Sequence, residues 1–238
     1  MTRQFASFTL ALLGLLALAA VSARADTYTF NTDHCSGGGC GTGIGTVTVI
    51  QDGLNTVEIS VAGSFGFATT GAGGDNAFFF NIEGSPTLTS ADVSIISPTP
   101  DPTGWELVTP APGSYAGDGL AGDFSYALNC SILGACGTSG ASQPGLLPLV
   151  FTVTSPGLTA AAFNDPGGTS GANTADFAAD AAVGCSTTDG VISCTGNTGL
   201  IGATLTSTPS PVPEPSSLFL LGTGLTALAG ALKLRHLA

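Results

Sequence analysis

The chain has 238 residues, of which only four are Lys or Arg and sixteen are Asp or Glu, for a formal net charge of −12. All four basic residues lie near the two ends, so residues 26–215 hold every acidic residue and no basic one, which gives them a formal charge of −16. This stretch cannot displace the counterions of a nucleic acid, and it lacks the cations for a phosphate clamp or a Schiff base.

The first 25 residues have the three parts of a secretory signal peptide. A basic residue stands near the start, residues 5–21 are almost wholly apolar, and Ala23 and Ala25 put small side chains at the two positions that signal peptidase reads. We therefore predict a signal-peptide helix over residues 1–25, with cleavage before Asp26. An uncleaved N-terminal anchor is the alternative. In both cases the rest of the chain is exported.

The body, residues 26–206, consists of short strand-like segments separated by Gly, Pro, Asn and Asp. Asp52-Gly53 between two alternating segments predicts a hairpin. The apolar run 77–82 predicts a strand that is buried on both faces. Residues 175–183 are ambiguous, and a short helix is one interpretation of them. The predicted strands are 46–50, 55–62, 77–82, 92–96, 105–109, 123–128, 149–154 and 200–206.

Many short strands with turn signals between them favour an all-β fold. A body of this length is typical of one domain, so we predict a single β-sandwich, jelly-roll-like, flanked by the signal-peptide helix and a C-terminal transmembrane helix.

Six cysteines fall into three close pairs, and an even number in an exported chain favours disulfides. Fifteen connectivities are formally allowed, and the clustering favours pairing between neighbours. One such pair flanks Thr188-Asp189-Gly190 and is placed to clip a hairpin. The alternative is a metal site at Asp33, His34, Cys35 and Cys40, although adjacent residues rarely chelate one ion well. The favoured pairs are Cys35 with Cys40, Cys130 with Cys136, and Cys185 with Cys194.

The body offers little catalytic chemistry. His34 is its only histidine, and we expect an exposed loop residue beside a disulfide rather than a catalytic base. A glycosidase needs only two carboxylates, for which Glu58, Glu83 and Glu106 are the candidates. No residue is predicted to be catalytic, and the protein is predicted not to be an enzyme.

No cofactor is expected, with calcium as the one candidate ligand. Asp118 and Asp123 lie in a Gly-rich turn that offers the oxygen donors calcium prefers, although a solvated acidic turn is the alternative. Trp105 and Tyr115 are candidates for stacking on sugars, with a core position as the alternative for Trp105.

The C-terminal part begins with a Pro-rich linker, residues 207–215, whose prolines prevent a helix from extending back through it. Residues 216–238 follow as an apolar segment with a basic end. The apolar segment of about 17 residues would rise roughly 26 Å as a helix, near the lower limit for a bilayer span. Lys233 and Arg235 favour the cytoplasmic side, which leaves the body outside.

Val212-Pro213-Glu214-Pro215, the apolar helix and the basic end with Lys233 and Arg235 together resemble the C-terminal signal of PEP-CTERM proteins. The basic end is thinner than in many such tails. The resemblance implies a membrane-embedded transpeptidase, exosortase, as a partner that recognises and processes the tail. It also implies a bacterium that makes exopolysaccharide, transient anchoring in the inner membrane, and delivery to the cell surface or biofilm matrix. Residues 26–49 resemble the start of several uncharacterised exosortase-sorted proteins, which implies a shared fold.

These observations predict an exported surface or extracellular-matrix protein with a structural or adhesive role. A polysaccharide-binding module, assisted by calcium, is the alternative, and a secreted glycan hydrolase is the third hypothesis. In each case the membrane is contacted through the C-terminal helix.

Overall fold

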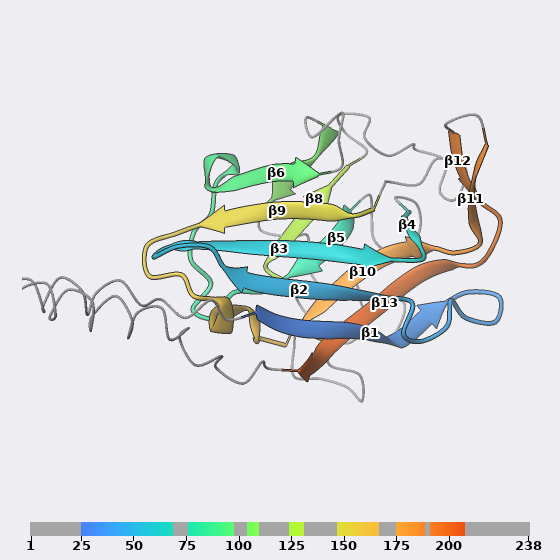
Figure 1. The fold of residues 1–238 in the computed structure, drawn as a ribbon, viewed down its shortest axis with the longest axis horizontal. Helices are drawn as coiled ribbons and strands as arrows, with labels where there is room; N and C mark the ends of the chain where they lie inside the picture. Colours follow the sequence, from blue (N-terminus) through green and yellow to red (C-terminus); the bar gives the residue numbers. More distant parts are fainter. Residues whose placement is uncertain are drawn as a thin grey trace, which may run out of the picture. The chain divides into compact units, whose positions relative to one another are not determined.

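The computed structural model describes residues 25–68, 76–97, 104–109, 124–130, 147–166, 175–188 and 191–207, shown in Figure 1. These residues belong to one compact unit, Arg24–Thr208. The signal peptide before Ala25, and the linker and sorting tail after Ser207, lie outside the described residues. Among the described residues, no helix is long and apolar enough to cross a membrane.

The described ranges are built of strands and two short 3-10 helices, which confirms the predicted all-β class. All eight predicted strands overlap an observed one, with ends that differ by up to three residues. The strands are β1 Ala25–Cys35, β2 Gly45–Gln51, β3 Thr56–Gly63, β4 Gly66–Phe67, β5 Asn76–Phe80, β6 Val93–Ser97, β7 Glu106–Val108, β8 Tyr126–Asn129, β9 Leu149–Thr154, β10 Phe177–Ala182, β11 Cys185–Thr188, β12 Val191–Cys194 and β13 Thr198–Ser207; the helices are η1 Ser90–Asp92 and η5 Ala160–Phe163.

Eleven strands form one antiparallel sheet in the order β6-β9-β3-β2-β1-β13-β10-β5-β8-β7, with β4 paired to β10. Strands β6, β9, β3, β2 and β1, here called the front arm, lie before β10, β5, β8 and β7, the rear arm (Figure 1). The ring of Phe78 in β5 lies 6.0 Å from that of Phe151 in β9, so the main core lies between the arms. The β-sandwich-like arrangement is confirmed, and its two layers are continuous through β1 and β13.

Strands of the front arm alternate between buried and outward-facing residues. In β3, Val57, Ile59 and Val61 are fully buried, whereas Glu58 is partly exposed. This is the period of two that an antiparallel sheet with one wet face requires. The predicted hairpin joins β2 to β3, and the N–H of Asp52 donates to the carbonyl of Thr56 at 2.9 Å.

Three strands of the rear arm are buried on both faces, whereas its edge strand β7 is partly exposed. Every residue of β5, β8 and β10 is buried. One face contributes to the main core, and the other holds a second cluster that includes Phe79, Phe124 and Leu200. The prediction of burial on both faces is therefore confirmed for residues 76–80.

The short helix considered for residues 175–183 is wrong. Residues 177–182 form β10, which pairs with β13 on one side and with β5 and β4 on the other. An alanine-rich segment favours a helix locally, but here two neighbouring strands satisfy its backbone and its small side chains fit between packed layers.

Candidate functional site

Two disulfides lie close to the start of β13. Cys35 and Cys40 close a Gly-rich loop after β1, and Cys185 and Cys194 join the paired ends of the β11–β12 hairpin. Both pairings were predicted and are confirmed. Cys130 is disulfide-bonded as well, and its predicted partner Cys136 lies outside the described residues.

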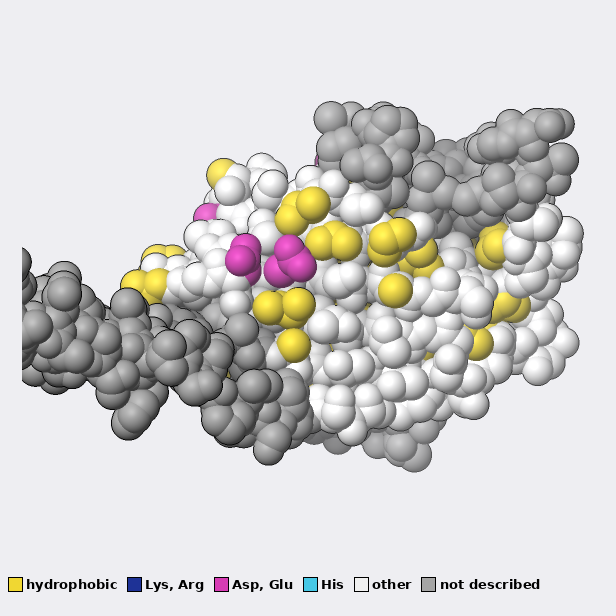
Figure 2. Space-filling view, in the orientation of Figure 1, with side chains coloured by type: hydrophobic (Ala, Val, Ile, Leu, Met, Phe, Trp, Pro, Cys, Tyr) yellow, Lys and Arg dark blue, Asp and Glu magenta, His cyan; other side chains and the backbone are white. Residues whose placement is uncertain are grey.

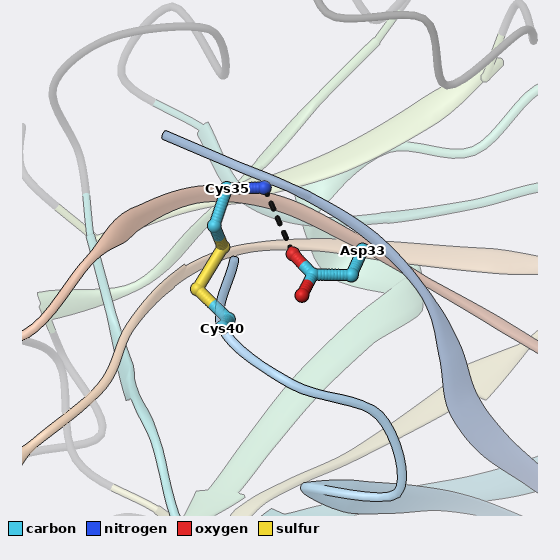
Figure 3. Close-up of side chains that lie close together, drawn as sticks. All are labelled: Asp33, Cys35 and Cys40. Atoms are coloured by element: carbon cyan, nitrogen blue, oxygen red, sulfur yellow. Dashed lines mark hydrogen bonds between the residues drawn. A yellow bond between two sulfur atoms is a disulfide. The ribbon is translucent and has the colours of Figure 1, made fainter. Parts of the chain in front are cut away.

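The carboxylate of Asp33 holds the Gly-rich loop in place (Figure 3). Its Oδ1 accepts a hydrogen bond from the N–H of Cys35 at 2.9 Å, and its Oδ2 accepts one from the N–H of Gly41 at 2.7 Å. Partial burial alone would raise the pKa of Asp33. Hydrogen bonds from the backbones of Cys40, Cys35 and Gly41, together with the charge of nearby His34, lower that pKa below its usual value.

Gly39 is required by this arrangement. Its φ is +91°, and a Cβ added there would lie 2.5 Å from Oδ2 of Asp33. Both the left-handed backbone and the close approach to the carboxylate exclude a larger residue. Gly39 therefore lets the backbone of the loop wrap around the carboxylate of Asp33.

Asn197, in the turn between β12 and β13, links the loop to the hairpin. Its Nδ2 donates to the carbonyl of Gly39 at 2.6 Å, and the N–H of Ser36 donates to the carbonyl of Thr198 at 3.0 Å. The base of the hairpin is closed by the N–H of Gly196, which donates to the carbonyl of Val183 at 2.9 Å. Residues 33–41, 183–188 and 191–198 thus form one hydrogen-bonded unit, here called the disulfide end.

Asp33, Cys35 and Cys40 place their potential metal-ligating atoms within 4.8 Å of one another. Two facts weigh against the metal alternative in this state. The two sulfurs are bonded to each other, so neither is the thiolate that zinc requires. Both oxygens of the carboxylate already accept backbone hydrogen bonds. The carboxylate of Asp33 therefore stabilises the backbone of the loop.

His34 is not the exposed loop residue that was expected. It lies in β1 opposite Leu200 of β13 and is partly buried. The loop begins only after Cys35, because β13 extends the pairing of β1 to that residue.

The three candidate carboxylates of a glycosidase come from separate elements. Glu58 lies in β3 of the front arm, Glu106 lies in β7 at the edge of the rear arm, and Glu83 follows β5. Trp105 is only 5% exposed and meets Phe67 edge-on at 5.3 Å, so its core interpretation is confirmed. Tyr115, Asp118 and Asp123 lie outside the described residues.

Sequence reasoning did not identify Asn197 or the role of Asp33. The Gly196-Asn197 pair signals a turn, but no local pattern shows that its amide reaches a loop more than 150 residues earlier in the chain. In the sequence, Asp33 was interpreted only as one of the four candidate ligands of the metal alternative.

The comparison with protein families concerns the C-terminal tail. Residues 211–235 match the family model of the PEP-CTERM protein-sorting motif, a span that includes every residue predicted for the signal: Val212, Pro213, Glu214, Pro215, Lys233 and Arg235. No curated protein and no solved structure matches the chain.

The chain is therefore an exported protein with a C-terminal sorting signal. More narrowly, this signal is a PEP-CTERM protein-sorting motif, and the match covers residues 211–235. Such signals are recognised by exosortase, a membrane protein, and the C-terminal region is anchored in the membrane before processing.

Proposed function

We propose that the mature body is a non-enzymatic component of the cell surface or extracellular matrix, and that it acts by structural or adhesive contact. The observation that carries the proposal is a PEP-CTERM sorting motif joined to a body of formal charge −15 that has no Lys or Arg. A sorting signal delivers the body, and the body then needs a fold that persists outside the cell.

Three carboxylates of the body support a structural role, because each accepts hydrogen bonds from backbone N–H groups. Asp33 binds the Gly-rich loop. Asp92 accepts hydrogen bonds from the N–H and hydroxyl of Thr89 at 2.7 and 2.8 Å, which caps η1. Asp176 accepts one from the N–H of Leu205 at 3.0 Å, next to the end of β13. In this part of the chain carboxylates replace the salt bridges that a body without cations lacks.

The charge of the body defines the conditions under which contact occurs. Copies of the body with a formal charge of −15 repel one another, and salt or divalent cations screen that repulsion. Adhesive contact between copies, or with an acidic matrix polymer, should therefore strengthen as salt or calcium is added. This dependence would be absent if contact relied on a neutral partner.

The sorting part of the proposal is tested by replacing Pro213, Glu214 and Pro215 with alanine. We expect the variant to accumulate unprocessed in the inner membrane, because the rigid acidic peptide that the enzyme reads is gone. The matched control is Pro209→Ala, which alters a linker proline outside residues 211–235. Cell fractionation and intact mass distinguish the forms. Normal processing of the triple variant would disprove the sorting proposal.

A polysaccharide-binding module, assisted by calcium, is the second candidate, and the outer face of the front arm favours it. This face carries rows of hydroxyl side chains, such as Thr29, Thr48 and Ser60, with Glu58 of β3 as a carboxylate among them. Figure 2 shows a surface that is mostly uncharged. Hydroxyls can exchange hydrogen bonds with neutral sugars without repulsion.

Retention on glycan arrays with and without millimolar calcium separates this candidate from the first. The double variant Thr48→Asp and Ser60→Asp should abolish retention if the face binds sugar, whereas Ser36→Asp at the disulfide end serves as a control. A hydrolase would instead release sugars from matrix fractions and lose that activity in E58Q, E83Q or E106Q. Such release would disprove the non-enzymatic proposal.

A further inference from the structure

The peptide bond that signal peptidase is expected to cut lies inside the sheet of the body. Cleavage before Asp26 breaks the bond between Ala25 and Asp26, and β1 begins at Ala25. In the register of the β1–β2 ladder, Ala25 is opposite Ile50 and Asp26 is opposite Val49. Asp26 is 2% exposed. The bond is therefore part of a paired strand, with its flanking residue enclosed by the fold.

The next two residues fix this strand from its other side. Thr27 is opposite Ser207 of β13, and Tyr28 is opposite Leu205. Tyr28 is fully buried, and its ring lies 4.7 Å from that of Phe177 in β10. Any opening that frees three residues on the C-terminal side of the Ala25–Asp26 bond must pull this ring out of the core.

A peptidase binds its substrate as an extended chain and uses the backbone groups around the cleaved bond. In the folded body the backbone of Ala25 and Asp26 is paired with β2 instead. Proteolysis of a folded segment depends on the population of its opened form. Opening here requires loss of ladder hydrogen bonds and exposure of Asp26, and of Tyr28 where the opening extends to it, so that population is small.

The strand partner of β1 is also the last strand of the body to leave the export channel. The β1–β13 ladder joins Thr27 to Ser207, and a two-stranded β1–β2 hairpin alone is marginally stable in water. The Ala25–Asp26 bond thus stays accessible while the chain is being exported, and it becomes enclosed once β13 pairs with β1.

We propose that removal of the signal peptide must precede the pairing of β1 with β13, and that the folded precursor is not a substrate of signal peptidase. The step is a hydrolysis in which water adds across the Ala25–Asp26 bond, leaving a carboxylate on Ala25 and an ammonium group on Asp26. This inference rests on the export route and not on the role proposed for the mature body.

Three full-length precursors, each with intact tail and signal, test the order when incubated with purified signal peptidase in detergent micelles. The first is the wild-type precursor with its disulfides formed. The second carries Phe78→Asp, which prevents the core from forming, since Phe78 is fully buried. The third has a Gly-Ser hexapeptide and a second Ala-Asp pair inserted between Asp26 and Thr27, which places an identical cleavage sequence in front of an intact β1.

We expect the folded wild-type precursor to be cut at least about 100-fold more slowly than the other two, since its opened population limits cleavage. Circular dichroism and thiol counting verify that the first and third precursors are folded. Equal cleavage of the wild-type and insertion precursors would overturn the proposal. Absence of cleavage at this bond in all three would also overturn it, because the cleavage site itself would then be wrong. Neither result bears on the sorting of the Pro213, Glu214 and Pro215 variant, which tests the proposed function separately.

Discussion

The front and rear arms of the sheet are built from the same kind of strand, yet they bury their side chains differently. In β3 of the front arm, buried residues alternate with outward-facing ones. In β5 and β10 of the rear arm, every residue is buried. The front arm has one face toward the core and one toward solvent. Strands β5, β8 and β10 of the rear arm form an interior layer that is buried on both faces, and only the edge strand β7 of this arm is partly exposed.

The difference shows how a body without cations is stabilised. Its main core is rich in aromatic residues, and several of them come from the rear arm, including Phe78, Phe80 and Phe177. Their rings contact one another at centroid distances near 6 Å. Burial of such side chains, not ion pairing, supplies most of the stability of this body. Substitutions in the rear arm should therefore cost more than similar ones on the outer face of the front arm.

The largest effect is expected for Phe78→Ala. Phe78 is fully buried and contacts Phe67, Phe151 and Phe177 across the core. Truncation of a buried Phe costs about 3–5 kcal/mol of unfolding free energy, because a cavity is added to the loss of burial. The control Thr48→Ala, on the outer face of the front arm, should change stability by less than about 0.5 kcal/mol. Urea unfolding of the oxidised protein measures both. Equal losses would contradict the contrast between the arms.

A smaller loss is expected for Ala179→Leu in β10. Ala179 is fully buried and lies opposite Ile201 of β13 and Phe78 of β5. Added methylenes have no free volume to fill in a packed layer, so we expect a loss of about 1–3 kcal/mol. The same enlargement at Ala62, an exposed residue of β3, should be nearly neutral. Thermal unfolding would contradict the two-sided burial of β10 if both variants behaved alike.

Asp33→Asn, at the disulfide end of β1, should destabilise the protein by about 1–2 kcal/mol at pH 7, since a charged acceptor of backbone N–H groups is replaced by a neutral one. The folded-state pKa of Asp33 is lowered from the ordinary 3.8. Its stabilisation is therefore complete above that value and is lost as the pH falls through the folded-state pKa. The gap between wild type and variant should close in acid. A gap that is constant with pH would show that the charge does not matter.

Asp176→Asn, next to β10, should have the smallest effect and the opposite sign. Burial raises the pKa of Asp176, the charge of Asp165 raises it further, and the hydrogen bond from Leu205 lowers it in part. Because a raised pKa means that the fold disfavours the carboxylate, the native protein bears a cost at pH 7 that disappears below the unfolded-state value near 3.8. The variant keeps an acceptor for Leu205 and should be more stable by less than about 1 kcal/mol at neutral pH. A loss of stability at pH 7 would contradict this account.

The front arm was the easier part to predict, because its pattern is local. The alternation around Ile59 and the turn at Gly53 specify a hairpin from a dozen residues. In the rear arm, the apolar run at 77–82 is also a local pattern, and it specifies the doubly buried strand β5. The alanines of β10 specify neither a hairpin nor a buried strand, because their burial depends on pairing with β13 and β5, which are separate segments of the chain. The loop that Asp33 stabilises depends on Asn197 for the same reason. The disulfide pairs were predicted from the proximity of the cysteines in the chain. The hydrogen bonds that join the two disulfide-bonded segments were not predicted.

The sorting motif was predictable from its three consecutive parts, whereas the proposed order of signal-peptide removal and folding was not. That order depends on the register that places Asp26 opposite Val49 and Thr27 opposite Ser207. A register of this kind joins the two ends of the body and has no local signal in the sequence.

Intact mass of the mature protein, isolated from cells that produce it, tests the central claim most directly. If the chain is exported and its tail is processed as a sorting signal, the mass will correspond to a protein that begins at Asp26, lacks the C-terminal residues through Ala238, and has no free thiol. A mass that still includes Ala238 would contradict the account, and the tail would then be a permanent membrane anchor.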